Sequence, residues 1–424
     1  MNRLIRCFAF VSCSLALCAW GEPVDAVRKA AAAQKAPLLD TLKELTAIES
    51  GSRDLEGLER IGKVIADRLR ALGGEVEVVA PADIARLEDT PPKVGNAVRA
   101  TFRGKGTKKI LLIAHMDTVY LKGMGAQQPF RVEGDHAWGL GIADDKHGIA
   151  LILHAIKILR EIGFDEYGTL TVLINPDEEI STPGHRALIT RLGAEHDATM
   201  SFEGGGSASD GVRLATAGIA GVTLRVKGKA SHAGASPERG VNALYELAHQ
   251  ILQMKDFSDP KAGVKMNWTT AKAGTNRNVI PADAEAMADV RVQKVSDYDG
   301  LEAKIRETAK KQLVPDAKVE IVFDRRRPPL EAPPASIAFA RHAQQVYEEL
   351  GMKLIVSTSS GGGGTDAAFA GLKARGAVVE GFGLRGFGSH SNDAEYIVIS
   401  SIEPRLYLAA RMIMDFSRGK VPAQ

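Results

Sequence analysis

The chain has 424 residues, of which 45% are hydrophobic, 25% charged and 5% aromatic. This length and composition are typical of a globular protein of about two domains, and they exclude collagen, a coiled coil and wholesale disorder. Lysine and arginine number 54 against 52 aspartate and glutamate residues, so the formal net charge is only +2. Because nucleic-acid binding requires a strong positive surface, we expect no nucleic-acid partner.

The N-terminus has the pattern of a secretory signal peptide. Arg3 and Arg6 precede an uncharged, mainly apolar run at residues 7–20, and this arrangement predicts a signal peptide at 1–21 and a secreted or periplasmic protein. A membrane helix is the alternative, but the run is shorter than the ~20 residues that a span needs, and we expect no stable membrane span. All three cysteines lie within this segment, so the mature protein would contain neither a disulfide nor a thiolate ligand.

The first and last thirds of the chain show the pattern of an α/β domain. Residues 24–48, 55–72 and 149–162 have apolar residues at spacings of three and four, which predicts helices. Short apolar runs typical of strands buried on both faces occur at residues 110–114, 170–174 and 378–379. Together these segments predict a mostly parallel sheet covered by helices.

The middle of the chain has a different pattern. It predicts, in order, a strand at 222–227, a helix at 241–254, strands at 264–272 and 284–292, a helix at 298–312 and a strand at 318–323. This β-α-β-β-α-β series is typical of a ferredoxin-like unit. We therefore predict an α/β domain built from residues 22–217 and 329–424, interrupted by an inserted α+β domain at 218–328.

Acidic and histidine residues follow the apolar runs of the α/β part. They are His115 and Asp117, Asp144 and Asp145, Glu178 and Glu179, and Glu203. In an open α/β sheet, the side chains that follow the carboxyl ends of the strands converge on one crevice. So many carboxylates could not all stay ionised within a few Å of one another without a cation. Carboxylates and imidazole without thiols suit zinc or a similar divalent ion, and a carboxylate-rich site also suits a pair of such ions.

Taken singly, these residues have simpler interpretations. Asp117 alone would more often be a cap or turn residue, and Glu178 with Glu179 would usually be a solvated pair in a loop. Their combination favours a site, and it also carries a family resemblance. Six segments resemble the motifs of the co-catalytic zinc exopeptidases of the aminoacylase and carboxypeptidase type: HMD (115–117), GIADDKHG (141–148), NPDEE (175–179), SFE (201–203), KASHAG (229–234) and GSHS (388–391).

Within this family the chain looks most like the bacterial glutamate carboxypeptidases of the carboxypeptidase G type, over about residues 39–416. The resemblance implies a zinc-exopeptidase catalytic domain and an inserted domain that forms a homodimer interface. It implies two zinc ions per subunit, with Asp144 bridging them. His115 and Glu203 would bind one ion, and Glu179 and His390 the other.

The resemblance also implies the roles of the neighbouring acids. Glu178 would be the general base that takes a proton from water. Asp117 would accept the second ring N–H of His115 and fix its tautomer. The peptide bond between Asp144 and Asp145 would be cis.

Four residues match substrate-binding positions of the family. His232 would reach the active site of the partner subunit to help hold the oxyanion, although from the sequence alone a surface-loop histidine is the simpler interpretation. Asn278 and Arg291 would grip the substrate carboxylate. Thr365, after the glycine-rich run 361–364, would present its hydroxyl to the same group; a phosphate loop is the alternative, but the Lys-Ser/Thr continuation is missing.

The segment after Glu203 departs from the family pattern. Glutamate-specific relatives place a lysine and a serine where this chain has residues 204–213, and Arg213 is the candidate replacement. We expect an exopeptidase that hydrolyses the amide next to a C-terminal amino acid of a small peptide or N-acyl amino acid, most simply the glutamate of folate-like substrates or N-acyl-glutamate. The alternatives are an N-acyl amino acid deacylase or dipeptidase with the same site, and an exported solute-binding protein without catalysis.

Overall fold

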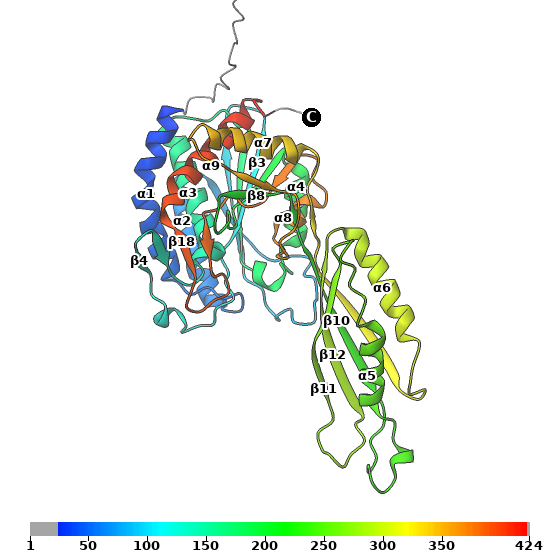
Figure 1. The fold of residues 1–424 in the computed structure, drawn as a ribbon. Helices are drawn as coiled ribbons and strands as arrows, with labels where there is room; N and C mark the ends of the chain where they lie inside the picture. The colour runs from blue at the N-terminus through cyan, green and yellow to red at the C-terminus, as the bar shows by residue number, and fades with distance from the viewer. Residues whose placement is uncertain (1–23, 422–424) are drawn as a thin grey trace, which may run out of the picture.

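The computed structural model describes residues 24–421, so the predicted signal peptide at 1–21 lies outside the described residues. Figure 1 shows a larger part, in which helices surround a sheet, and a smaller part, drawn in green and yellow, that projects away from it. No helix among residues 24–421 combines the length and the apolar character that crossing a membrane requires.

The larger part is built on a six-stranded mixed sheet. Its strands are, in order across the sheet, β1 (Glu75–Val79), β2 (Ala97–Arg103), β6 (Thr169–Asn175), β3 (Lys109–His115), β7 (Ala198–Ser201) and β16 (Ala377–Val379). From β6 to β16 all neighbours are parallel, whereas β2 runs antiparallel to both β6 and β1. The structure therefore confirms the predicted mostly parallel sheet and places strands at all three apolar runs.

Helices cover both faces of this sheet because its central strands are apolar on both. In β3, Ile110 and Leu112 belong to one core and Leu111 and Ile113 to the other, as the two-residue period of a strand requires. Helices α1, α3 and α9 pack against one another beside the first core, which α2 and α7 also join, and α4 packs on α8 at the second. These helices are α1 (Asp25–Thr46), α2 (Leu55–Ala71), α3 (His147–Glu161), α4 (Arg186–Glu195), α7 (Ala335–Glu348), α8 (Ala367–Gly371) and α9 (Ile402–Ser417).

The smaller part is an antiparallel sheet with two helices. Its elements are β10 (Gly218–Lys227), α5 (Ala243–Met254), β11 (Lys265–Ala273), β12 (Asp283–Val292), α6 (Val295–Ala309) and β13 (Lys318–Arg327). The strand order is β11-β12-β10-β13, and every neighbouring pair is antiparallel. Both helices lie on the same face of the sheet (Figure 1). The predicted β-α-β-β-α-β series is thus confirmed, and β11 is an edge strand.

Short strands complete the larger part. One small sheet has the order β17 (Gly386–Phe387), β18 (Tyr396–Val398), β5 (His136–Trp138) and β4 (Arg131–Glu133). Two further pairs are β8 (Gly211–Arg213) with β15 (Ile355–Ser357), and β9 (Ala215–Thr216) with β14 (Leu330–Glu331). These strands connect the C-terminal third of the chain to the loops that follow the central sheet.

Candidate metal centre

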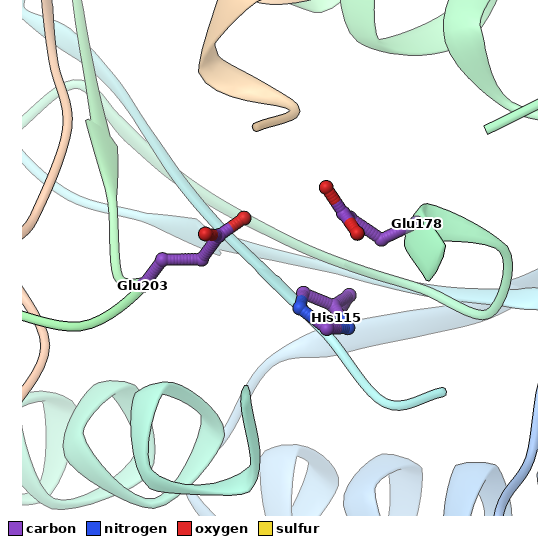
Figure 2. Close-up of side chains that lie close together, drawn as sticks. All are labelled: His115, Glu178 and Glu203. Carbon is purple, nitrogen blue, oxygen red and sulfur yellow. The ribbon is translucent and has the colours of Figure 1, made fainter. Parts of the chain in front are cut away.

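The candidate ligands lie in the loops at the carboxyl ends of the central strands. His115 is the last residue of β3, Glu178 and Glu179 follow β6, and Glu203 lies two residues after β7. Asp144 lies in the short turn before α3, and the peptide bond that follows it is cis, as the resemblance implied. Figure 2 shows the side chains of His115, Glu178 and Glu203 converging from three different segments. The parallel sheet therefore gathers residues that are distant in sequence.

Asp144 lies between two imidazoles. Its Oδ1 is 3.1 Å from Nε2 of His115, and its Oδ2 is 3.3 Å from Nε2 of His390. The same nitrogen of His390 is 3.1 Å from Oε2 of Glu179. Although burial opposes it, hydrogen bonds from the two histidines hold the pKa of Asp144 below its usual range. A carboxylate whose two oxygens face different ligands is arranged as a bridge between two ions.

Two groups of side chains could each hold an ion. His115, Asp144 and Glu179 offer ligand atoms that lie within 4.8 Å of one another, and so do His115, Glu178 and Glu203. His115 belongs to both groups. Glu178, for which the resemblance implied the role of base, therefore lies among the atoms that could contact an ion. Asp144 and Glu203 line the same cavity, together with Glu178, Glu179 and His390.

The chemistry of these residues fits divalent cations. Burial raises the pKa of Glu178 to about 8, that of Glu179 to about 7, and that of Glu203 well above its usual range. Oε1 of Glu179 is buried and has no hydrogen-bond partner within residues 24–421. Buried carboxylates that lack partners are costly, and a bound divalent ion would satisfy them. Carboxylate and imidazole ligands suit zinc and similar ions.

Asp117 fixes the positions of the residues around it. Its carboxylate lies 3.3 Å from Nδ1 of His115, which is also 3.1 Å from the backbone carbonyl of Asp117. The backbone N–H groups of Glu178 and Glu179 each donate to this carboxylate at 3.1 Å, and Ser52 donates to it at 2.7 Å. Because Nδ1 of His115 faces these oxygens, Nε2 is the nitrogen left to bind an ion.

The sequence interpretation missed Arg327, the last residue of β13. Its buried guanidinium forms a short ion pair with Oε1 of Glu178 and donates from Nη2 to the backbone carbonyl of Glu178 at 2.6 Å. Its Nη1 lies 3.5 Å from Oδ1 of Asp366. The arginine run 325–327 indicated only a domain boundary, and nothing in that run distinguishes its third residue.

Glu395 was also missed. Its carboxylate accepts hydrogen bonds from the backbone N–H groups of Gly141 and Ala143, both at 2.8 Å, and a short one from the hydroxyl of Tyr120. This hydroxyl also lies 2.9 Å from the carbonyl of Ser391. Glu395 and Tyr120 therefore join the turn that carries Asp144 to the loop that carries the neighbouring histidine.

The predicted substrate residues fall into two places. Arg291 and Thr365 line the cavity of about 500 Å³ that contains the acidic residues, and Arg213 lines it too. His232 and Asn278 lie on the inserted domain and do not line that cavity. Nδ1 of His232 accepts from two backbone N–H groups at 3.1 Å, so a neutral ring carries its proton on Nε2.

Comparison with known proteins gives the family. Residues 111–415 match the peptidase family M20/M25/M40. Carboxypeptidase G2 of Pseudomonas sp. (strain RS-16) is 43% identical over 392 residues, which make up 92% of each chain. The uncharacterized protein YqjE of Bacillus subtilis (strain 168) is 30% identical over 264 residues, 60% of this chain and 66% of YqjE.

Solved structures share the fold. The aminopeptidase PepT of Bacillus cereus superposes with a TM-score of 0.71 at 22% identity, covering 90% of this chain and 98% of PepT. The M20 family metallo-carboxypeptidase Sso-CP2 of Sulfolobus solfataricus gives 0.71 at 16% identity, covering 90% and 99%. At these identities the likeness concerns the fold alone. With the sequence match over most of the chain and the cluster of carboxylates and imidazoles, the chain belongs to peptidase family M20/M25/M40 and is a metallopeptidase of that family.

Proposed function

We propose that this protein is an exported dizinc carboxypeptidase that releases C-terminal glutamate from folate-like or other N-acyl-glutamate substrates. The observation that carries the proposal is the position of Asp144 between His115 and His390, with Glu178 in the same cavity. The identity of 43% with a carboxypeptidase G2 along 92% of the chain supports it. A homolog of p-aminobenzoyl-glutamate hydrolase from Haemophilus influenzae, 36% identical over 90 residues, is consistent with a glutamate leaving group.

His115, Asp144, Glu179, Glu203 and His390 would hold the two zinc ions. When bound, such ions lower the pKa of water and polarise a carbonyl group. Glu178 would accept the proton from the attacking water and donate it to the leaving amine. Burial raises the pKa of Glu178 to about 8, and Arg327 opposes this rise by stabilising the carboxylate. A pKa near neutrality suits a group that both accepts and donates a proton.

The leaving residue would lie in the cavity beside the three arginines Arg213, Arg291 and Arg327. Arg291 would grip its α-carboxylate, since its Nη1 lies 3.2 Å from the carbonyl of Gly362 in the glycine-rich loop. The buried hydroxyl of Thr365 has no hydrogen-bond partner in the described chain and would donate to the same carboxylate.

Arg213 would bind the side-chain carboxylate of glutamate. The guanidinium of Arg291 forms two hydrogen bonds of 2.9 Å with Asp289, and Arg327 is paired with Glu178. The closest carboxylate to Arg213 in the described chain, that of Glu380, lies 3.8 Å away. Arg213 is thus the arginine of this cavity with the weakest carboxylate pairing, and a second acidic group of the substrate would pair with it.

The protein would act as a homodimer through its inserted domain. The edge strand β11 lies beside α5, which exposes 62% of Tyr245 and 65% of Leu252. Exposed apolar residues next to an unpaired edge suit association with a second copy. His232 would then reach the site of the partner subunit, with its Nε2–H as donor to the oxyanion. Light scattering of Leu252→Glu tests this interface, for which we expect a monomer; an unchanged dimer would contradict it.

A substrate panel tests the proposed activity. N-acyl-glutamate, N-acyl-leucine, a dipeptide and an aminopeptidase substrate are compared before chelation, after chelation, and after zinc is restored. We expect the fastest hydrolysis for N-acyl-glutamate, its loss on chelation and its recovery with zinc. Faster hydrolysis of the N-acyl-leucine or the dipeptide would favour the deacylase or dipeptidase alternative. Activity that survives metal removal would refute the proposal.

A further inference from the structure

A second cavity lies beside the metal centre. It has a volume of about 470 Å³ and is lined by residues 51–54, residues 118–122, Glu179 and Ile180. Glu179 lines this cavity and also the cavity that holds the arginines, so the two meet at a candidate metal ligand. We propose that this second cavity, called here the acyl pocket, binds an apolar acyl group on the substrate. The inference rests on the proposed carboxypeptidase function and adds the chemical class of the group that is not released.

The lining of the acyl pocket is apolar where it faces solvent. Residues 118–121 alternate in burial: Thr118 and Tyr120 are buried, whereas Val119 is 39% and Leu121 is 72% exposed. Because alternate residues of an extended segment share a face, Val119 and Leu121 point to the same side. Ile180, which follows Glu179, completes the apolar part of the lining. Large apolar side chains held open beside an active site are typical of a ligand-binding surface.

The segment that carries these side chains is held in place by the fold. The N–H of Thr118 donates to the carbonyl of Ser50 at 3.0 Å, and its carbonyl accepts from the N–H of Ser52 at 3.1 Å. Glu49 accepts from the N–H groups that follow, those of Gly123 at 2.9 Å and Gly125 at 2.7 Å. Such a surface is ready before the substrate arrives, which lowers the entropic cost of binding.

Close packing also requires a glycine beneath this segment. A Cβ atom on Gly51 would lie 2.4 Å from the backbone carbonyl oxygen of Tyr120. Both residues line the acyl pocket. The two backbone segments therefore approach as closely as they can only because Gly51 has no side chain, which defines the shape of the wall.

The charges of the two cavities indicate which end of the substrate each one binds. The first cavity contains Arg213 and Arg291, which suit the carboxylates of the leaving residue. In the acyl pocket, Lys122 is paired with Glu56 at 3.0 Å and Arg53 donates to the backbone carbonyl of Asp89. An amide at the metal centre has only two ends. With the carboxylate end among the arginines, the acyl end extends past Glu179 into the acyl pocket.

The test measures how hydrolysis depends on the length of the acyl chain. Acetyl-, butyryl- and hexanoyl-glutamate are compared as substrates of the zinc-loaded enzyme, and the same three acyl groups are compared on leucine. We expect kcat/KM to rise by about threefold for each methylene group, as apolar burial predicts. Leu121→Ser and Val119→Ser should each flatten this rise. Leu313→Ser, on an equally open leucine (57% exposed) of the inserted domain, should keep it.

The outcomes separate this inference from the proposed function. A wild-type enzyme that shows no dependence on acyl length with either leaving residue would overturn the acyl pocket. So would a full length dependence in both Leu121→Ser and Val119→Ser. If glutamate is not preferred, the proposed leaving group is wrong, but the leucine series still measures the acyl-length dependence. Both variants change exposed side chains, so they should fold as the wild type does.

Discussion

Arg327 holds Glu178 at two points, because its guanidinium pairs with the carboxylate and also donates to the backbone carbonyl of the same residue. Arg327 is the last residue of β13 in the inserted domain, whereas Glu178 follows β6 of the central sheet. The proposed base is therefore positioned by the junction between the two parts of the chain. The arrangement is buried, since only 3% of the Arg327 side chain is exposed.

Replacement of Arg327 should therefore lower turnover. Arg327→Met leaves Glu178 and Asp366 without their shared cation, and the loss of one partner of a buried pair costs about 3 to 5 kcal/mol. We expect kcat to fall by at least roughly tenfold, as a fraction of the contribution of a positioned acid–base group. Arg327→Lys should recover part of the loss. Arg325→Met is the control, because Arg325 pairs with Asp299 and Glu302 near the surface. Wild-type kcat in Arg327→Met would show that the pair does not position the base.

Asp117→Asn should weaken metal binding. The carboxylate of Asp117 contacts the ring of His115 and accepts from the N–H groups of Glu178 and Glu179. An amide of the same size can no longer accept at both oxygens, and loss of such an orienting partner typically costs 10- to 100-fold in metal affinity. Competition with a zinc chelator measures the affinity, and Asp67→Asn on the exposed face of α2 is the control. Equal zinc affinities in both variants would rule out this role.

His154 should make stability depend on pH. It is 5% exposed, and its ring nitrogens lie 2.8 Å from Gln34 Oε1 and 2.9 Å from Thr41 Oγ1. Burial lowers the pKa of His154 from 6.5 to about 4, so between these values the unfolded chain binds a proton that the folded chain does not. Its contribution is therefore complete above pH 6.5 and is lost as the pH falls toward 4. At pH 5 the loss is about 2 kcal/mol relative to pH 7.

Chemical denaturation of the wild type and of His154→Gln at pH 7 and pH 5 measures this contribution. Other titrating groups affect both proteins equally, so the difference between their two pH dependences isolates His154. The free energy of unfolding should fall less between pH 7 and pH 5 in the variant than in the wild type. Identical falls in the two proteins would mean that His154 is not held neutral.

The sequence predicted the parts of the fold that depend on local patterns. Buried parallel strands are continuous apolar runs, so the runs at 110–114 and 170–174 identified β3 and β6. Element ends were less accurate. Strand β10 begins at Gly218, four residues before the prediction, because pairing with β12 overrides the low strand propensity of its glycines. Helix α5 begins at Ala243, because the side chain of Asn242 caps it.

The sequence could not predict contacts that only the tertiary fold creates. Glu178 and Arg327 are 149 residues apart, and Gly141 and Glu395 are 254 apart. No spacing rule connects them. The short strands β17 and β18 were missed for another reason: segments of two or three residues are too short to show a period. By contrast, the ligands share the simple property of following apolar strands, which is why the sequence could group them.

Metal content and turnover of Glu178→Gln test the central claim most directly. The account predicts two divalent ions per chain in both the wild type and the variant, and a turnover that is lower in the variant by about 10²- to 10⁴-fold. Glu195→Gln, at the end of α4, is the matched control and should keep wild-type turnover. If Glu178→Gln binds its metal fully and still turns over at the wild-type rate, the account is contradicted, because no other residue has been assigned the proton.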